Sequence, residues 1–265
     1  MSHTPRLYVP ADLMAEGPVA LDEAQAKYLF RVMRMKEGDK VRLFNGRDGE
    51  WLASISEILG KASGMLRVEE QLRQQSRLTD LHLYFAPLKK TRTDFVVEKA
   101  TELGVEVIQP VITDFTQSER VRTDRLSNLA MEAAEQTERL NMPKVRDASP
   151  LIRLLGELED HRFVYFCDER GDDETAAWGG DVNRARPMAD VLRERGTHSA
   201  AILIGPEGGF SPKERDMLRK MKTVIPVSLG PRILRAETAA VSALTLYQAL
   251  CGDWQASAHG IASDD

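Results

Sequence analysis

The sequence predicts an α/β fold in which a parallel sheet carries helices on both faces, preceded by a small β-barrel. From Leu81 onward, short apolar runs alternate with helix-like runs, as in strands joined by crossover helices. Residues 1–75 instead hold short strand-like runs separated by hairpin turns. Near the C-terminus, two loops rich in glycine and proline each join a strand-like run to a helix-like run, which is typical of a ligand site at the carboxyl edge of an open sheet.

The predicted amino-terminal domain, residues 1–75, begins with one helix and continues with strands. The helix-like run over 22–34 ends before Gly38. Asn-Gly and Asp-Gly pairs within 45–49 are hairpin signals. Polar residues 71–77 form the predicted linker. The expected strands are 41–44, 51–55 and 64–68.

The predicted carboxy-terminal domain, residues 78–265, alternates strands and helices. Ser211, Pro212 and Glu214 are an N-cap, a first-turn proline and a capping-box glutamate, so a helix begins at about residue 212. Residues 171–186, rich in Asp, Gly and Asn, look like an exposed insertion. The expected strands are 81–85, 105–112, 163–166, 200–204 and 224–228, and the other expected helices are 93–103, 124–140, 188–195 and 239–250.

The two glycine loops carry the functional signal. Their glycines permit positive φ and close approach of a ligand to bare backbone, and Pro206 and Pro231 stiffen the turns. The sequence lacks the glycine pattern of dinucleotide sites, the phosphate-binding P-loop and the zinc-protease motif, so these chemistries have no support. Five histidines are scattered without metal-ligand spacing, and no metal is expected.

In these loops the chain resembles the RsmE family, the 16S ribosomal RNA uracil N3-methyltransferases of the SPOUT class of knotted methyltransferases. The signature loops correspond to Leu203–Ser211 and Leu229–Ala239. Further segments at 31–39, 95–105 and 132–136 are similar to recurrent stretches of that family. The family usually follows the last of these with two small residues and an arginine. Here Thr137-Glu138-Arg139 keeps the arginine but adds a negative charge.

The resemblance implies a trefoil-knotted α/β domain behind a PUA-like RNA-binding barrel, with S-adenosylmethionine as methyl donor. The uracil N3 proton is weakly acidic, so a positive group near the developing anion and a proton acceptor would help. Arg235 is the candidate for the first role, and Glu237 or Glu135 for the second. The residues expected to hold S-adenosylmethionine are Ile204, Gly205, Pro206, Glu207, Gly208, Gly209, Ser228, Leu229, Gly230, Ile233, Leu234 and Ala239.

A net charge of −5 does not exclude an RNA partner, because local positive charge is what phosphates require. Basic residues gather over 27–47, 89–92 and 120–122, whereas acid gathers over 168–174. The expected partner is 16S ribosomal RNA of the small ribosomal subunit. The residues expected to contact it are Arg31, Arg34, Lys36, Lys89, Arg92, Arg120 and Arg139.

Two other functions remain open: a knotted RNA 2′-O-ribose methyltransferase, and a non-catalytic RNA-binding ribosome assembly factor. The chain is expected in the cytoplasm, because it shows no signal peptide or spanning segment and its two cysteines read as buried thiols. The helix at 239–250 is apolar around most of its circumference. It therefore predicts a homodimer built on that helix, with Ala243 and Leu246 facing the partner.

Overall fold

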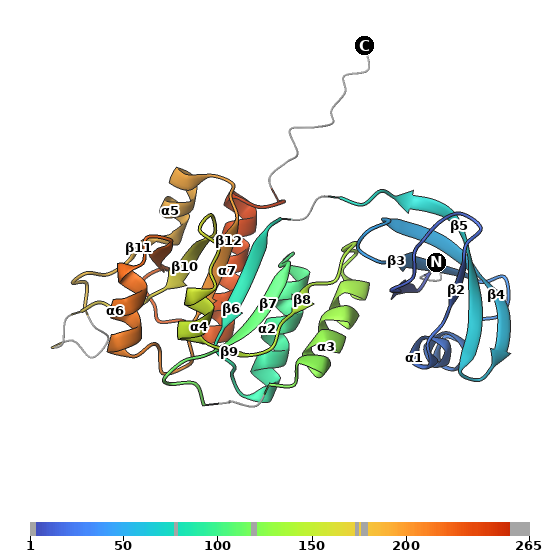
Figure 1. The fold of residues 1–265 in the computed structure, drawn as a ribbon, viewed down its shortest axis with the longest axis horizontal. Coiled ribbons are helices and arrows are strands. Elements are labelled where there is room, and N and C mark those ends of the chain that lie inside the picture. The colour runs from blue at the N-terminus through green and yellow to red at the C-terminus, as the bar shows by residue number, and fades with distance from the viewer. Residues whose placement is uncertain (1–3, 77–78, 118–120, 173–174, 176–179, 255–265) are drawn as a thin grey trace, which may run out of the picture. The chain divides into compact units, whose positions relative to one another are not determined.

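The computed structural model describes residues 4–76, 79–117, 121–172, 175 and 180–254 (Figure 1). The chain forms two compact units. The first comprises Met1–Arg77 and Met131–Met142, and the second comprises Leu78–Ala130 and Pro143–Asp265. The segment 131–142 was expected in the second domain and instead belongs to the first unit. Helix α3, Thr123–Gln136, therefore contributes to both.

The first unit is a five-stranded sheet in the order β1-β3-β4-β5-β2, wrapped around one core. The pair β1–β3 is parallel and the other pairs are antiparallel. Every strand contributes to this core, as a small barrel requires. The elements are β1 (Arg6–Tyr8), β2 (Pro18–Ala20), α1 (Glu23–Lys27), the π-helical turn η1 (Tyr28–Val32), β3 (Lys40–Phe44), β4 (Glu50–Gly60) and β5 (Ser63–Arg73).

In this unit the predicted hairpin is correct, whereas the predicted helix over 22–34 and the start of the predicted linker are wrong. The hairpin glycines adopt positive φ, and a Cβ at Gly49 would lie 2.1 Å from the carbonyl oxygen of Arg73. The single helix over 22–34 is instead a short α-helix followed by a π-helical turn. Strand β5 runs to Arg73, so the first residues of the predicted linker pair with β4 rather than connect domains.

A buried ion network holds the segment 131–142 to the sheet of the first unit. The Arg6 guanidinium bonds Glu50 at 2.5 Å and the carbonyl oxygens of Ala134 and Arg139 at 2.7 and 2.5 Å. Glu50 also accepts from Arg73 at 2.9 Å. Burial alone would raise the pKa of Glu50, but the hydrogen bonds from Arg73 and Arg6 outweigh it and lower that pKa. Removing one partner from a buried pair costs about 3 to 5 kcal/mol because it leaves a buried charge unpaired, so loss of either Arg6 or Glu50 should be strongly destabilising.

The second unit is an eight-stranded sheet in the order β11-β13-β10-β12-β6-β7-β8, with β9 also paired to β7. All its pairings are parallel. Strands β6 and β12 are buried on both faces, as parallel strands between helical layers must be. The strands are β6 (Leu81–Phe85), β7 (Val107–Ile112), β8 (Lys144–Val145), β9 (Ser149–Pro150), β10 (Phe163–Cys167), β11 (Arg186–Pro187), β12 (Ala200–Ile204) and β13 (Val224–Ser228).

Helices cover both faces of this sheet, which confirms the predicted α/β architecture (Figure 1). Side chains alternate along each strand, so Leu83 and Ile202 face α2, α5 and α7, whereas Tyr84 and Leu203 face α4 and α6. The helices are α2 (Lys90–Glu102), α4 (Leu151–Gly156), α5 (Met188–Arg195), α6 (Pro212–Lys220) and α7 (Ala236–Leu250).

The predicted strands 200–204 and 224–228 and helices 188–195 and 212 onward are correct. The helix expected over 124–140 ends at Gln136, and Glu138 has a positive φ of 60° just beyond it. The short elements α4, β8, β9 and β11 were not predicted. Cys167 and Cys251 are free thiols. Strand order alone does not report a knot, so the trefoil knot stays a prediction.

Within the described residues, no helix is both long enough and apolar enough to cross a membrane.

Candidate functional site

The predicted glycine loops lie at the carboxyl edge of the parallel sheet. Strand β10 lies between β12 and β13, with Phe166 in register with Leu203 and Pro226. Because the strands are parallel, their carboxyl ends meet at one edge, where α/β proteins bind ligands. The loops after β6, β7, β10, β12 and β13 therefore belong to one site region.

The first loop, Gly205–Phe210, is a tight turn held by its own packing. A Cβ at Gly205 would lie 2.6 Å from the Phe210 ring, so only glycine lets this ring pack against Phe166. Gly209 has a φ of 71° and donates its N–H to the Pro206 carbonyl oxygen at 2.9 Å. A Cβ at Gly209 would meet nothing within 4 Å, so the space above this backbone is open.

The predicted capping box at the start of α6 also ties this loop to the loop after β7. Ser211 accepts from the Glu214 N–H, and Glu214 accepts from the Ser211 N–H. In addition, Ser211 Oγ donates to the Asp114 carboxylate at 2.6 Å, and Glu214 accepts from the Asp114 N–H at 2.9 Å. These bonds bring exposed Phe115 beside Gly208, where an added Cβ would lie 3.4 Å from Phe115 Cβ.

The second loop, Leu229–Arg235, also leaves open space above its backbone. Gly230 has a φ of 121°, and a Cβ there would meet nothing within 4 Å. Ile233 is 68% exposed, whereas Leu234 packs on the core beneath α7. Arg235 is the exposed N-cap residue of α7, and its side chain makes no capping hydrogen bond. An exposed apolar side chain and a cation with no ion pair among the described residues thus lie on the same loop.

Three charged residues from separate elements meet between these loops. Arg92 of α2 bonds Glu207 of the first loop at 2.5 Å and lies 3.7 Å from Glu237 in the first turn of α7. The other Glu237 oxygen, Oε2, is buried and has no hydrogen-bond partner among the described residues. Buried acceptors are nearly always paired, so this oxygen needs a partner that the described residues do not supply. The sequence had predicted RNA contact for Arg92, S-adenosylmethionine contact for Glu207 and proton acceptance for Glu237.

A pocket of about 310 Å³ adjoins the first loop. It is lined by Pro87, Leu88, Lys89, Lys90, Gln117 and Glu207. A larger pocket of about 500 Å³ lies beside β11 and β13, and its lining residue Arg184 bonds the Gly230 carbonyl oxygen of the second glycine loop. Its Arg186 and Arg219 are already paired with Glu194 and Asp168. The smaller pocket has the basic rim that an anionic ligand needs.

Two of the predicted S-adenosylmethionine residues are buried and have backbone partners of their own. Ala239 is buried in the core, and its N–H donates to the Arg235 carbonyl oxygen within α7. Ile204 is also buried, and its carbonyl oxygen accepts from the Ala86 N–H. The structure brings the other ten residues together at the carboxyl edge. They are Gly205, Pro206, Glu207, Gly208, Gly209, Ser228, Leu229, Gly230, Ile233 and Leu234.

Glu135 belongs to the first unit and has a structural partner there. Its carboxylate accepts from the Tyr8 N–H at 2.9 Å, and burial raises its pKa. The role of Glu135 as a proton acceptor stays a prediction. Arg139 is likewise held in the first unit, with Nε donating to Asn141 and its carbonyl oxygen accepting from Arg6. Arg120 lies outside the described residues.

Most of the basic segment 27–47 is neutralised within its own unit. The basic residues with acidic partners are Lys27 with Glu23, Lys40 with Glu69, Arg42 with Glu138, and Arg47 with Asp12. Arg31, Arg34 and Lys36 are exposed, and none forms an ion pair with any residue that the structure describes. Next to them, Val32 is 69% and Met33 41% exposed. These three residues are the cations of this segment that have no acidic partner among the described residues.

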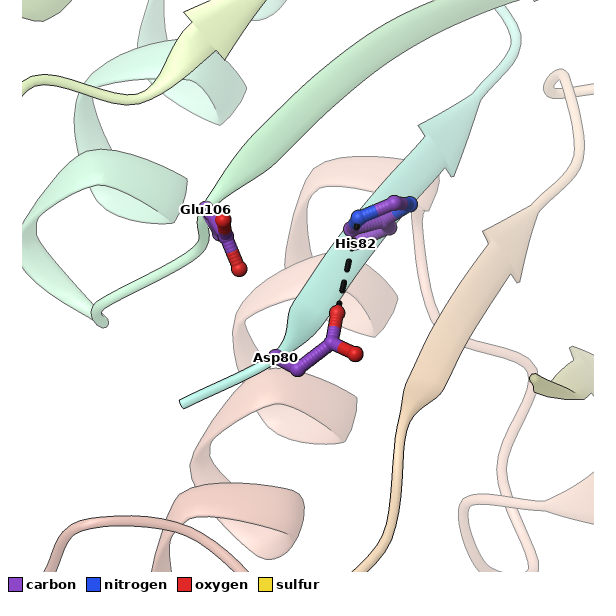
Figure 2. A group of neighbouring side chains, drawn as sticks. All are labelled: Asp80, His82 and Glu106. Atoms are coloured by element: carbon purple, nitrogen blue, oxygen red, sulfur yellow. Dashed lines mark ion pairs between the residues drawn. The ribbon is translucent and has the colours of Figure 1, made fainter. Parts of the chain in front are cut away.

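Asp80, His82 and Glu106 form a group that sequence spacing did not reveal. Figure 2 shows their side chains converging at the amino ends of β6 and β7, with ligand atoms within 4.8 Å of one another. However, the Arg162 guanidinium bonds Asp80 at 2.6 Å. Burial, together with Arg162, lowers the pKa of His82 to about 4. A cation would have to displace this guanidinium from Asp80, so we assign no metal site to the group.

Comparison with known proteins identifies both units. Residues 74–248 match the RNA methyltransferase domain family, and residues 21–63 match the RNA methyltransferase PUA domain. The ribosomal RNA small subunit methyltransferase E of Rickettsia conorii is 32% identical over 92% of this chain and 95% of its own length. The protein of the same name from Synechocystis is also 32% identical, over 92% of this chain and 77% of its own.

Solved structures agree with this assignment. The ribosomal RNA small subunit methyltransferase E of Neisseria gonorrhoeae, bound to S-adenosyl methionine, superposes with a TM-score of 0.81 at 26% identity, covering 95% of this chain and 100% of its own. A Legionella pneumophila putative methyltransferase with bound cofactor SAM gives 0.79 at 28% identity, covering 93% and 98%. The chain therefore belongs to the RNA methyltransferase family, in the branch of the ribosomal RNA small subunit methyltransferases E, as its loops indicated.

Proposed function

We propose that the protein transfers a methyl group from S-adenosylmethionine to N3 of a uridine in 16S ribosomal RNA of the small subunit. The observation that carries this proposal is the pair of glycine loops at one sheet edge, each with open space above its backbone. The names of the relatives support small-subunit ribosomal RNA as substrate, and the bound ligands of the two solved structures support the methyl donor.

The carboxyl edge fits S-adenosylmethionine. Gly208, Gly209 and Gly230 would let the donor approach bare backbone, and Ile233 with Leu234 would form an apolar wall. The unpaired Oε2 of Glu237 would accept a hydrogen bond from a donor group of the ligand. When bound, S-adenosylmethionine supplies a methyl group already activated by its sulfonium, so the chain needs only to orient the two reactants and accept a proton.

Arg235 and Glu237 are the residues proposed to act at the uracil. Arg235 is exposed beside the second loop, so its guanidinium would stabilise negative charge on the uracil as N3 loses its proton. Glu237 is proposed as the acceptor of that proton. It lies in the first turn of α7, two residues after Arg235, and 3.7 Å from Arg92.

RNA contact is proposed for both units. In the first unit, the cluster Arg31, Arg34 and Lys36 would bind phosphates. In the second unit, Lys89 lines the pocket beside Glu207, whereas Arg92 is engaged by two glutamates and acts as a positioning residue in this scheme.

A cytoplasmic homodimer built on α7 is also proposed. Ala243 is fully buried in the chain's own core, so the expectation that it faces a partner was wrong, whereas Leu246 is half-buried and remains a candidate for the contact. The exposed or half-buried face of α7 includes Thr238, Val241, Ser242, Thr245, Leu246, Ala249 and Leu250. A second copy of the helix would cover its apolar members in a two-fold contact.

The first prediction concerns the first loop. Gly208 has no positive φ and a Cβ there makes only an ordinary contact with Phe115, so Gly208→Val should fold normally. Its side chain would fill the ligand space, and calorimetry should show loss of S-adenosylmethionine binding. Gly156→Ala at the end of α4, where a Cβ meets nothing, is the matched control. Wild-type affinity in the valine variant would remove the loop from the site.

The second prediction tests the reaction. The purified protein, incubated with S-adenosylmethionine and small-subunit particles lacking the modification, should yield N3-methyluridine on nucleoside mass spectrometry. A 2′-O-methylated nucleoside would support the ribose alternative, and no methylation would support the assembly-factor alternative.

Arg31→Glu with Arg34→Glu should raise the KM for the particle and lower the salt dependence of that KM, with S-adenosylmethionine affinity unchanged.

The third prediction concerns assembly. Light scattering should report about twice the 29.7 kDa chain mass, and Val241→Asp should halve it because a charge would be buried at the contact. A stable wild-type monomer with full activity would refute the dimer.

A further inference from the structure

The loop after β10 reaches both glycine loops, although sequence reasoning gave it no role. Its first two residues, Asp168 and Glu169, directly follow the strand that lies between β12 and β13. Asp168 is buried and pairs with Arg215 at 2.9 Å and with Arg219 at 2.7 Å. Both arginines belong to α6, the helix that begins where the first loop ends. Asp168 therefore fixes the element behind the first loop.

Glu169 makes the corresponding contacts to the second loop. Its Oε1 accepts from the Leu229 N–H at 2.9 Å, and its Oε2 accepts from Ser228 Oγ at 3.4 Å. Burial raises the pKa of Glu169, because the loop hydrogen bonds and the charge of Arg184 offset only part of its loss of water. A half-buried carboxylate thus accepts hydrogen bonds from the backbone N–H of Leu229 and from the Ser228 hydroxyl.

Arg184 holds the other side of the same turn. Its Nη2 donates to the Gly230 carbonyl oxygen at 2.7 Å. Most described residues of the segment 171–186 are exposed, as expected, although Arg184 is half-buried and Asp172 pairs with Arg219. Residues 173, 174 and 176–179 of that segment lie outside the described residues. Glu169 therefore accepts from the N–H of Leu229, and Arg184 donates to the carbonyl oxygen of the next residue, Gly230. The backbone of Gly230 lies in the left-handed region. Without such contacts, a glycine turn samples many conformations.

We propose that Glu169 is a positioning residue that, with Arg184, holds the second glycine loop in the conformation that receives the methyl donor. This inference rests on the proposed function, since it takes S-adenosylmethionine as the ligand of that loop. Glu169 acts through the Leu229 N–H rather than on the ligand. What matters is therefore the acceptor oxygen and its reach, and not the negative charge.

Three substitutions separate these properties. Glu169→Gln keeps an acceptor oxygen of the same reach, Glu169→Asp keeps the charge but is one methylene shorter, and Glu169→Ala removes both. Loss of one buried hydrogen bond should raise the Kd and KM for S-adenosylmethionine by about tenfold in the Asp and Ala variants, with kcat and RNA affinity little changed. The Gln variant should stay within about threefold of wild type. Glu157→Ala, at an exposed pair on α4, is the matched control.

Amide exchange of the free protein gives a readout that needs no ligand. The Leu229 N–H should be protected in the wild type and the Gln variant, and should lose protection in the Asp and Ala variants. Wild-type affinity in the Asp and Ala variants, or a Gln variant as weak as Ala, would overturn the proposal. So would an unprotected Leu229 in the wild type. Should Ala fail to fold, the comparison of Gln with Asp decides. A wild type that protects Leu229 but binds no S-adenosylmethionine would contradict the proposed function alone.

Discussion

The parallel pairing of β10 with β12 on one side and β13 on the other is the constraint on which the site depends. It places the carboxyl ends of three strands side by side, so loops from residues 168, 205 and 229 onward meet although the chain separates them. Each strand must be buried on both faces to hold this position, which explains why α7 and α6 pack on opposite sides of the same sheet. The glycines then supply only local freedom within a frame that the sheet fixes.

Which basic residues have acidic partners matters more for RNA binding than the net charge of the chain. In the first unit, acidic partners occupy most of the basic residues over 27–47 and leave Arg31, Arg34 and Lys36 free among the described residues. In the second unit, arginines are used to fix loops: Arg92 joins two glutamates, and Arg215 and Arg219 share Asp168. A net charge of −5 is therefore compatible with a small, selective phosphate-binding surface.

The sequence was sufficient for features set by local chemistry. The capping box of Ser211 and Glu214 and the glycine turns were predicted because neighbouring residues determine them. The Arg92–Glu207–Glu237 group was not predicted, since its members come from three distant segments and meet only through the sheet order. The place of 131–142 in the first unit was not predicted for the same reason, because it depends on the long-range hydrogen bonds of Arg6. Glu169 had a usable signal: it follows a predicted strand at the edge where ligands bind.

The central claim is that the carboxyl edge of this sheet holds the methyl donor. A crystal structure of the protein grown with S-adenosylmethionine tests it most directly. We expect ligand density between Gly205–Phe210 and Leu229–Arg235. The ligand should lie within hydrogen-bonding distance of the loop backbone and of Glu237. Density in the 500 Å³ pocket beside β11, or at the amino edge near His82, would contradict the account.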